Sequence, residues 1–501
     1  MSTARRSAVA ALAAAALAGP LLPTPTANAR PAPATSGPAH PGTDHAKEAA
    51  QLSRELVRMS SAEDAYRHLR KLQSIADANH STRAAGTPGH EASAQYVHDT
   101  LRKAGYRVSY QTFGITYIET RAEKLSVVTP GAPARKATVS AMSYTKSTPV
   151  GGIEAALAAV PLDATTGCEA ADYAAGAFTG KIALIRRGGC TFTVKQAAAA
   201  GAGAVAALIY NDTGGVLSGT LGSAAGAKIP TGGLSGADGT ALAADAAKGA
   251  TVSLEIRQLQ EPRTTRNVVA ETPGGDPAHT VMLGAHLDSV TAGPGINDDG
   301  SGSAGLIEVA QQLARTHRPL ADKVRFAWWS GEELGLLGSG AYVKGLTAPQ
   351  KKQIALYLNF DMIASPNYAQ LVYDSTAPAP TGTAPAPVPA GTDRLTKGIT
   401  SFLDRRHVPH EATAFDGRSD YGPFMAAGIP SGGSYTGAEE LKTAAQAEKF
   451  GGTAGVALDA CYHAACDTLK NIDMTAFDLN IDVIADAVGT YAYTAGPSAR
   501  P

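Results

Sequence analysis

The chain has 501 residues, of which 44% are hydrophobic and 17% charged, and its formal net charge is −1. This length suffices for two or three domains, and the composition excludes global disorder. A charge so near zero provides no electrostatic footprint for nucleic acid or a membrane surface, so neither is expected as a partner.

Residues 1–29 are typical of a secretory signal peptide. Two arginines precede a short apolar run at 8–18, and an Ala-Asn-Ala sequence at 27–29 has the small residues of a cleavage site. The apolar run is shorter than the ~20 residues that span a membrane, so we expect a secreted, extracellular protein. Residues 30–52 are rich in Pro, Ala and His with little periodicity, which predicts a disordered leader or propeptide.

The next two segments differ in periodicity and composition. Helical periodicity runs from about residue 53 to 103, and 106–113 alternates like a strand. From about 125 the sequence is dominated by Ala, Gly and Thr with short apolar runs and few candidate catalytic groups. This change predicts a small β-rich α/β domain at 125–262, inserted into a larger domain formed by 53–124 and 263–495.

The second part of the larger domain alternates strands with helices. The runs 281–286, 324–329 and 355–360 predict strands, and 302–313 and 334–343 predict the helices between them. This order predicts an α/β fold with a mostly parallel twisted sheet and helices on both faces. In such sheets the site lies at the carboxyl ends of the strands.

Imidazoles and carboxylates stand where the site is expected. His286 ends the first of these predicted strands, Glu333 and Asp361 come after the second and third, and Asp298 and His463 add a further carboxylate and imidazole. These donors suit two zinc ions with an open coordination position. Two ions about 3.5–4 Å apart can share a carboxylate, for which Asp298 is the natural candidate, with one histidine for each ion.

Three neighbours of these ligands have predicted supporting roles. Asp288, two residues after His286, is expected to accept its ring N–H. Glu332 is expected to act as general base, and the phenol of Tyr462 to stabilise an oxyanion. Taken singly, each acidic residue after a strand has an alternative role as a helix cap.

Four cysteines in a secreted chain favour disulfides. Three pairings are formally possible, and proximity in the sequence favours Cys461 with Cys466 and Cys168 with Cys190. A Cys/His metal cluster is the alternative.

These motifs resemble those of the secreted bacterial co-catalytic di-zinc aminopeptidases of the leucyl-preferring aminopeptidase S type. The resemblance covers roughly residues 69–117 and 266–479, and the segment 125–262 resembles a protease-associated domain. The matching motifs are Gly284-Ala285-His286-Leu287-Asp288, Gly295-Ile296-Asn297-Asp298, Glu332-Glu333-Leu334-Gly335, Asn359-Phe360-Asp361-Met362, Asp416-Gly417-Arg418-Ser419-Asp420 and Cys461-Tyr462-His463.

The resemblance implies a zinc exopeptidase fold and specific residue roles. One zinc would be bound by His286, Asp298 and Asp361, and the other by Asp298, Glu333 and His463. The substrate amino group would be held by carboxylates including Glu332, with help around Arg418. Met362 and Tyr435 match positions that line an apolar side-chain pocket.

The resulting expectation is a secreted, monomeric zinc aminopeptidase that removes an N-terminal, preferably apolar residue from peptides or proteins. The alternatives are another zinc exopeptidase, such as a carboxypeptidase or dipeptidase, and a receptor-like protein without catalysis. Calcium near Asp478 and Asp482 is doubtful because no N-terminal acidic partner is evident. The insert is expected to gate substrate or dock proteins, or to be a passive lid.

Overall fold

The computed structural model describes residues 41–212, 215–378 and 388–495, so the predicted signal peptide lies outside the described residues. Within them, the predicted extent of the leader is wrong. The leader was expected to be disordered as far as residue 52, but helix α1 (Pro41–Met59) begins at Pro41, and Leu52 and Leu56 are fully buried. The helix packs along α12 (Met474–Thr494), a partner too distant in sequence for local periodicity to reveal.

We call residues 41–124 and 263–495 the main domain and residues 125–262 the insert. The main domain is built on a mixed sheet in the order β13-β12-β14-β11-β9-β10-β8. Its strands are β8 (Thr251–Glu271), β9 (Asp276–His286), β10 (Asp322–Trp329), β11 (Ile354–Phe360), β12 (Leu371–Tyr373), β13 (Glu411–Thr413) and β14 (Ser431–Tyr435). The central strands β10, β9, β11 and β14 are parallel, as predicted, whereas β8 and β12 add antiparallel neighbours.

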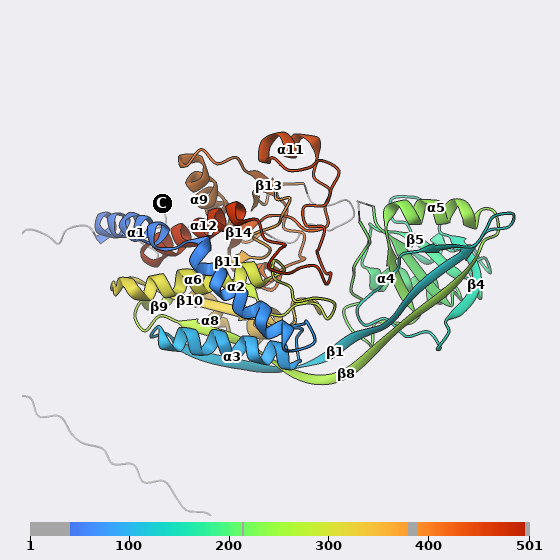
Figure 1. Ribbon diagram of the computed structural model, residues 1–501, viewed down its shortest axis with the longest axis horizontal. Coiled ribbons are helices and arrows are strands. Elements are labelled where there is room, and N and C mark those ends of the chain that lie inside the picture. Colours follow the sequence, from blue (N-terminus) through green and yellow to red (C-terminus); the bar gives the residue numbers. More distant parts are fainter. Residues whose placement is uncertain (1–40, 213–214, 379–387, 496–501) are drawn as a thin grey trace, which may run out of the picture. The chain divides into compact units, whose positions relative to one another are not determined.

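Side chains alternate along the central strands and build a core on each face. In β9, Val281, Leu283 and Ala285 face one core, and Met282 faces the other. The first core is covered by α1, α2 (Ala62–Asp77), α3 (Pro88–Lys103), α6 (Gly300–Thr316), α9 (Thr392–Arg405) and α12 (Figure 1). The second is covered by α7 (Leu337–Gly345) and α10 (Tyr421–Ala426). The prediction of helices on both faces is confirmed.

The remaining helices of the main domain are short. They are α8 (Ala348–Gln353), between α7 and β11, and α11 (Ala444–Phe450), between β14 and α12. The loop from α11 to α12 is long, and it carries a disulfide and one of the predicted ligands.

Two long antiparallel strands connect the main domain to the insert. β1 (Arg107–Val128) pairs with β8 along its length, and both begin in one domain and end in the other (Figure 1). The other strands of the insert are β2 (Arg135–Ala137), β3 (Ser140–Ala141), β4 (Ile153–Ala159), β5 (Ile182–Arg186), β6 (Ala206–Tyr210) and β7 (Thr231–Leu234). Strands β4 to β7 are parallel, and α4 (Phe192–Gly201) and α5 (Gly236–Ala246) pack against them. The insert is therefore a continuation of the main sheet, with its own cores.

Candidate metal centre and substrate cavity

The predicted ligands and the predicted base gather at one edge of the main sheet. His286 ends β9, Glu332 and Glu333 follow β10, and Asp361 follows β11. Because β9 runs parallel to both β10 and β11, the carboxyl ends of the three strands meet at this edge. Asp298 arrives from the loop before α6, and His463 from the loop before α12.

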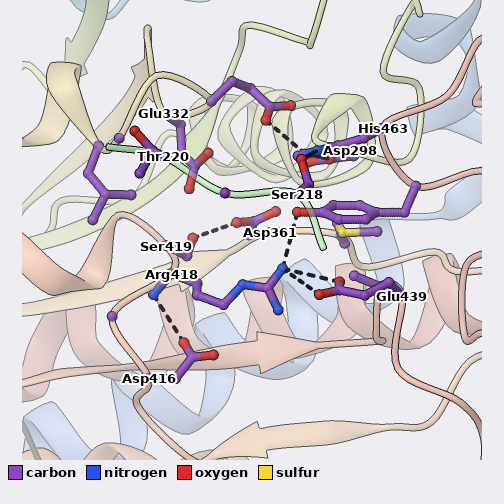
Figure 2. A pocket seen from close by; sticks show the side chains of 18 of the residues that line it. Ser218, Thr220, Asp298, Glu332, Asp361, Asp416, Arg418, Ser419, Glu439 and His463 are labelled. Atoms are coloured by element: carbon purple, nitrogen blue, oxygen red, sulfur yellow. Dashed lines mark hydrogen bonds and ion pairs between the residues drawn. The ribbon is translucent and has the colours of Figure 1, made fainter. Parts of the chain in front are cut away.

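The ligand side chains form two sets that share one carboxylate. His286 Nε2 lies 3.1 Å from Asp298 Oδ1 and 3.5 Å from Asp361 Oδ1. His463 Nε2 lies 3.2 Å from Asp298 Oδ2 and 2.9 Å from Glu333 Oε2. Each imidazole therefore faces a different oxygen of Asp298, which is the geometry of a bridging carboxylate; Figure 2 shows Asp298 beside His463.

This donor set fits a pair of zinc ions. The ligand atoms of His286, Asp298 and Glu333 lie within 4.8 Å of one another. In the described part of the chain, Glu333 Oε1 is buried without a hydrogen-bond partner. Leaving a buried acceptor unpaired costs about 1–3 kcal/mol, and a cation would remove that cost. Three protein ligands for each ion leave the open position that a catalytic zinc site needs.

Asp299 lies near the centre but is occupied by backbone groups. Its carboxylate is close enough to His286 and Asp361 to form a ligand group with them. Its oxygens, however, accept N–H bonds from His286 at 3.1 Å, Gly302 at 2.8 Å and Met362 at 3.1 Å. Asp299 thus caps α6 and fixes the backbone around two ligands. The sequence analysis missed this role because it started the helix at residue 302, whereas α6 begins at Gly300, directly after Asp299.

Asp288 supports His286 through a different atom from the one predicted. β9 ends at His286, so the alternation of a strand no longer aligns the two side chains. His286 Nδ1 lies 3.0 Å from the Asp288 carbonyl oxygen and 3.8 Å from Asp288 Oδ1. The ring N–H donates to the carbonyl, which leaves Nε2 free to bind a cation. Asp288 Oδ1 instead accepts the backbone N–H of Glu332 at 3.3 Å.

Arg83 holds the loop that connects His286 to Asp298. The guanidinium is fully buried and donates to the carbonyls of Leu287, Pro294 and Gly295. Arg83 follows α2 in a loop, far from the ligands in sequence, and no local pattern distinguishes it. Sequence reasoning therefore missed it.

Asp467 holds the other end of the same loop. Its two oxygens accept the backbone N–H groups of Asn297 at 2.8 Å and Asp298 at 3.0 Å. Asn471 also donates to it, at 3.1 Å. The carboxylate of Asp298, the predicted bridge, is thus positioned by a residue that directly follows the disulfide at Cys466.

The electrostatics of the centre are those of a cation site. Burial lowers the pKa of His463, but Glu333 and Asp298 outweigh it and raise the pKa to about 10. Burial likewise lowers the pKa of His286, but the nearby carboxylates of Asp361 and Asp298 outweigh burial and raise this pKa well above its usual value. Burial also raises the pKa of Glu332, which makes its carboxylate a stronger proton acceptor.

A cavity of about 350 Å³ opens over these groups. From the main domain it is lined by Glu332, Asp361, Met362, Arg418, Tyr435 and Tyr462, and from the insert by Arg187, Phe192, Leu217, Ser218, Gly219 and Thr220. Figure 2 shows the insert segment with Ser218 and Thr220 passing beside Glu332 and His463. The sequence analysis found few candidate catalytic groups in the insert and identified none of the lining residues that the insert contributes.

Arg418 lies in the cavity between acidic groups. Its Nη2 donates to Glu439 Oε2 at 3.1 Å and to the Tyr462 hydroxyl at 3.2 Å. Its Nη1 lies 3.5 Å from Glu440 Oε1. The adjacent Ser419 donates to Asp361 Oδ2 at 2.5 Å. The two glutamates were not predicted, because they stand in a loop without a recognisable motif.

Both predicted disulfides are present. Cys168 pairs with Cys190, and Cys461 pairs with Cys466. The second disulfide closes a short loop that contains Tyr462 and His463, because its two cysteines are five positions apart in the sequence.

Comparisons with known families identify two segments. Residues 267–488 match the model of peptidase family M28, and residues 153–242 match the PA domain. The first match contains every predicted metal ligand, and the second lies inside the insert.

Relatives of similar length carry aminopeptidase names. A probable lipoprotein aminopeptidase, LpqL, of Mycobacterium tuberculosis is 41% identical over 90% of this chain and 89% of its own length. Leucine aminopeptidase 2 of Trichophyton rubrum is 43% identical over 84% of this chain and 82% of its own length.

Solved structures agree with these relatives. An aminopeptidase from Aneurinibacillus sp. strain AM-1 superimposes with a TM-score of 0.67 at 27% identity, covering 88% of this chain and 96% of its own. A zinc aminopeptidase from Bacillus subtilis gives 0.59 at 26% identity, with 85% and 94% covered.

Proposed function

The chain belongs to peptidase family M28 and is a metallo-aminopeptidase, and from this premise we propose that it uses two zinc ions to release an apolar N-terminal residue from peptides. The observation that carries the proposal is the shared carboxylate. Asp298 faces His286 with one oxygen and His463 with the other, at 3.1 and 3.2 Å.

The ligand assignment follows from these distances. His286 and Asp361 would hold one ion and Glu333 and His463 the other, with Asp298 between them. When bound, the ions would polarise the scissile carbonyl and lower the pKa of a coordinated water to about 7. Arg83, Asp299 and Asp467 are not ligands in this scheme, since their polar atoms are engaged by the backbone.

Two side chains of the cavity would carry the proton and charge chemistry. Glu332 is half-buried beside the ligand set without joining it, and we assign it the proton of the attacking water and its later transfer to the leaving amine. Tyr462 directs its hydroxyl into the cavity beside His463, and we assign it a hydrogen bond to the oxyanion.

The charge of the cavity favours a substrate amine over a carboxylate. Glu332 and Asp361 provide an anionic wall for an N-terminal ammonium. A carboxypeptidase would need a free cation, but Arg418 is engaged by Glu439 and Glu440. A second cavity arginine, Arg187, donates to Asn211 and faces Asp212 of the insert. Carboxypeptidase activity is therefore the weaker candidate.

Side-chain preference would come from the wall around Met362 and Tyr435. Met362 is 2% exposed and Tyr435 lines the same cavity, so a leucyl side chain would contact mainly carbon. The insert would limit the room for the rest of the substrate, because Phe192 and the segment 217–220 form the opposite wall.

Export of the protein is also part of the proposal. The two disulfides support an oxidising compartment, in agreement with the signal peptide predicted at 1–29. Among the described helices, none is long and apolar enough to cross a membrane. We further propose a monomer in which the insert spans residues 125–262 and the main domain spans 41–124 and 263–495, with its first part beginning at α1.

A calcium requirement is not part of the proposal. Asp482, one of the two aspartates considered for it, accepts a hydrogen bond from Arg406. Asp478 accepts the backbone N–H of Ala62 at 2.8 Å. A calcium ion would have to displace the guanidinium that pairs with Asp482.

The test is a paired assay on the purified protein with leucyl-p-nitroanilide and its N-acetylated form. Chelator-sensitive release from the free amine alone, with two zinc ions per chain restored on reactivation, is the expected result. Equal cleavage of the acetylated substrate would refute the amine anchor. One zinc ion at full activity would refute the shared-carboxylate mechanism. Glu332→Gln is the matched control, since it should retain both ions while losing activity.

A further inference from the structure

The positive charge of the Arg418 guanidinium is paired with carboxylates of the protein and is not free to bind a charged ligand. Nη2 donates both to Glu439 at 3.1 Å and to the hydroxyl of Tyr462 at 3.2 Å, and Nη1 faces Glu440 at 3.5 Å. Glu440 is itself held by the hydroxyl of Tyr435 at 3.2 Å. Two carboxylates therefore face one guanidinium, and its remaining contact is a neutral phenol.

The direction of the hydrogen bond to Tyr462 follows from chemistry. A guanidinium has five N–H donors and no acceptor, so the phenol oxygen must accept from Arg418. The phenol proton is then left for another acceptor. Tyr462 lines the cavity with Glu332 and Asp361, where the carbonyl oxygen of a bound peptide would lie.

The ring of Tyr462 is fixed by its neighbours. It stacks on the imidazole of His463, with ring centroids 3.8 Å apart and planes inclined by 24°. The backbone is held by the disulfide of Cys461 and by the Cys461 N–H, which donates to Asp459 at 2.8 Å. With the ring in place, the main remaining freedom of the phenol is rotation of its O–H bond.

We propose that Glu439 and Arg418 form a positioning chain that aims the Tyr462 hydroxyl at the oxyanion. Glu439 orients Arg418, and Arg418 donates to one lone pair of the phenol oxygen, which leaves the phenol proton to point to the substrate. Arg418 thus acts through Tyr462 and not on the substrate amine. This inference rests on the proposed function, because it requires a reaction that develops an oxyanion.

Removal of Arg418 has a specific consequence in this arrangement. Glu439 and the phenol oxygen share the same donor nitrogen, so without it the carboxylate becomes the nearest strong acceptor for the phenol proton. The hydroxyl then turns away from the substrate. The loss should therefore appear in kcat, because the oxyanion forms only in the transition state.

The experiment is a double-mutant cycle on leucyl-p-nitroanilide with Arg418→Gln, Tyr462→Phe and the double variant. Tyr462→Phe should lower kcat by about 10²–10³-fold, the usual effect of losing one oxyanion donor. Arg418→Gln should lower kcat by about tenfold or more with KM little changed, and should add nothing to Tyr462→Phe. Losses that multiply, or a KM effect of Arg418→Gln that persists without the phenol, would overturn the proposal.

A binding readout separates positioning from misfolding. The phosphonic acid analogue of leucine mimics the oxyanion, and calorimetry should show that Arg418→Gln weakens its binding while leucinamide binding is unchanged. Arg418→Gln should weaken binding of the analogue equally when Glu332 is also replaced by Gln, since Glu332 is not part of the positioning chain of Glu439, Arg418 and Tyr462. Glu439→Gln should also lower kcat, but by less than Arg418→Gln does. A zinc content equal to that of the wild type shows that each variant is folded. Wild-type protein without aminopeptidase activity would instead refute the proposed function.

Discussion

Replacement of Arg83 by methionine tests whether a buried guanidinium holds the metal loop in place. Arg83 is fully buried and donates to the carbonyls of Leu287, Pro294 and Gly295. Methionine has a similar length and no donors, so Arg83→Met removes the hydrogen bonds with little change in packing volume. The loop that it releases connects His286 to Asp298.

The expected magnitude follows from the groups left behind. Each orphaned buried carbonyl costs about 1–3 kcal/mol, and removing one partner from a buried charged network costs about 3–5 kcal/mol in measured cases. Because methionine regains part of this through apolar contact, we expect a net loss of about 3–5 kcal/mol. That is a large fraction of the roughly 5–15 kcal/mol by which proteins are stable.

The assay is urea unfolding of the full chain, with excess zinc and with a chelator. Arg121→Met is the matched control, since Arg121 is 51% exposed and pairs with Glu119 at 3.0 Å; it should cost less than about 1 kcal/mol. Arg83→Met should also gain less stability from zinc than the wild type gains, because the loop binds the ions less well. A variant within 1 kcal/mol of wild type in both conditions would refute the role assigned to Arg83.

Three further predictions concern the base, the insert and two buried histidines. Glu332→Gln should lower kcat by about 10²–10⁴-fold while zinc content by atomic absorption stays at the wild-type value; loss of zinc would instead make Glu332 a ligand. Thr220 lies on the cavity wall that the insert contributes, so Thr220→Trp should raise KM for leucyl tetrapeptides more than for leucinamide. The control is Val150→Trp, because Val150 is 82% exposed and its replacement should change neither KM. Equal effects of Thr220→Trp on both substrates would contradict a role of the insert in substrate access. Burial lowers the pKa of both His68 and His90 to about 4, against about 6.5 in the unfolded chain. The unfolded chain therefore binds more protons below pH 6.5, and unfolding free energy should fall on acidification by about 2 kcal/mol for each imidazole at pH 5. His90→Gln should flatten this dependence in urea titrations, and an unchanged slope would count against the assignment.

The elements of the main sheet and the predicted ligands are readable in the sequence for one physical reason. Strands that alternate with helices become parallel, and parallel strands bring their carboxyl ends to one edge. Residues that follow successive strands, such as His286, Glu333 and Asp361, must then lie near one another. Cys461 and Cys466 are similarly constrained, since their separation of five residues leaves little choice of partner.

Contacts without a local pattern were beyond sequence reasoning. Residues 41–52 look unstructured in isolation and become helical because Leu52 is buried in the main core. Asp288 was placed beside His286 by strand geometry, but the strand ends one residue too early, and the carbonyl makes the contact instead.

The sequence alone thus determined the chemistry of this protein: the donor types, their order along the chain and the strand ends that present them. Only the tertiary structure decided how they are held and what surrounds them. Arg83 reaches its carbonyl partners across about 200 positions of the chain, and Ser218 of the insert reaches His463 from still farther away. Such contacts depend on how the packed elements meet in space, and a linear pattern carries no information about that distance.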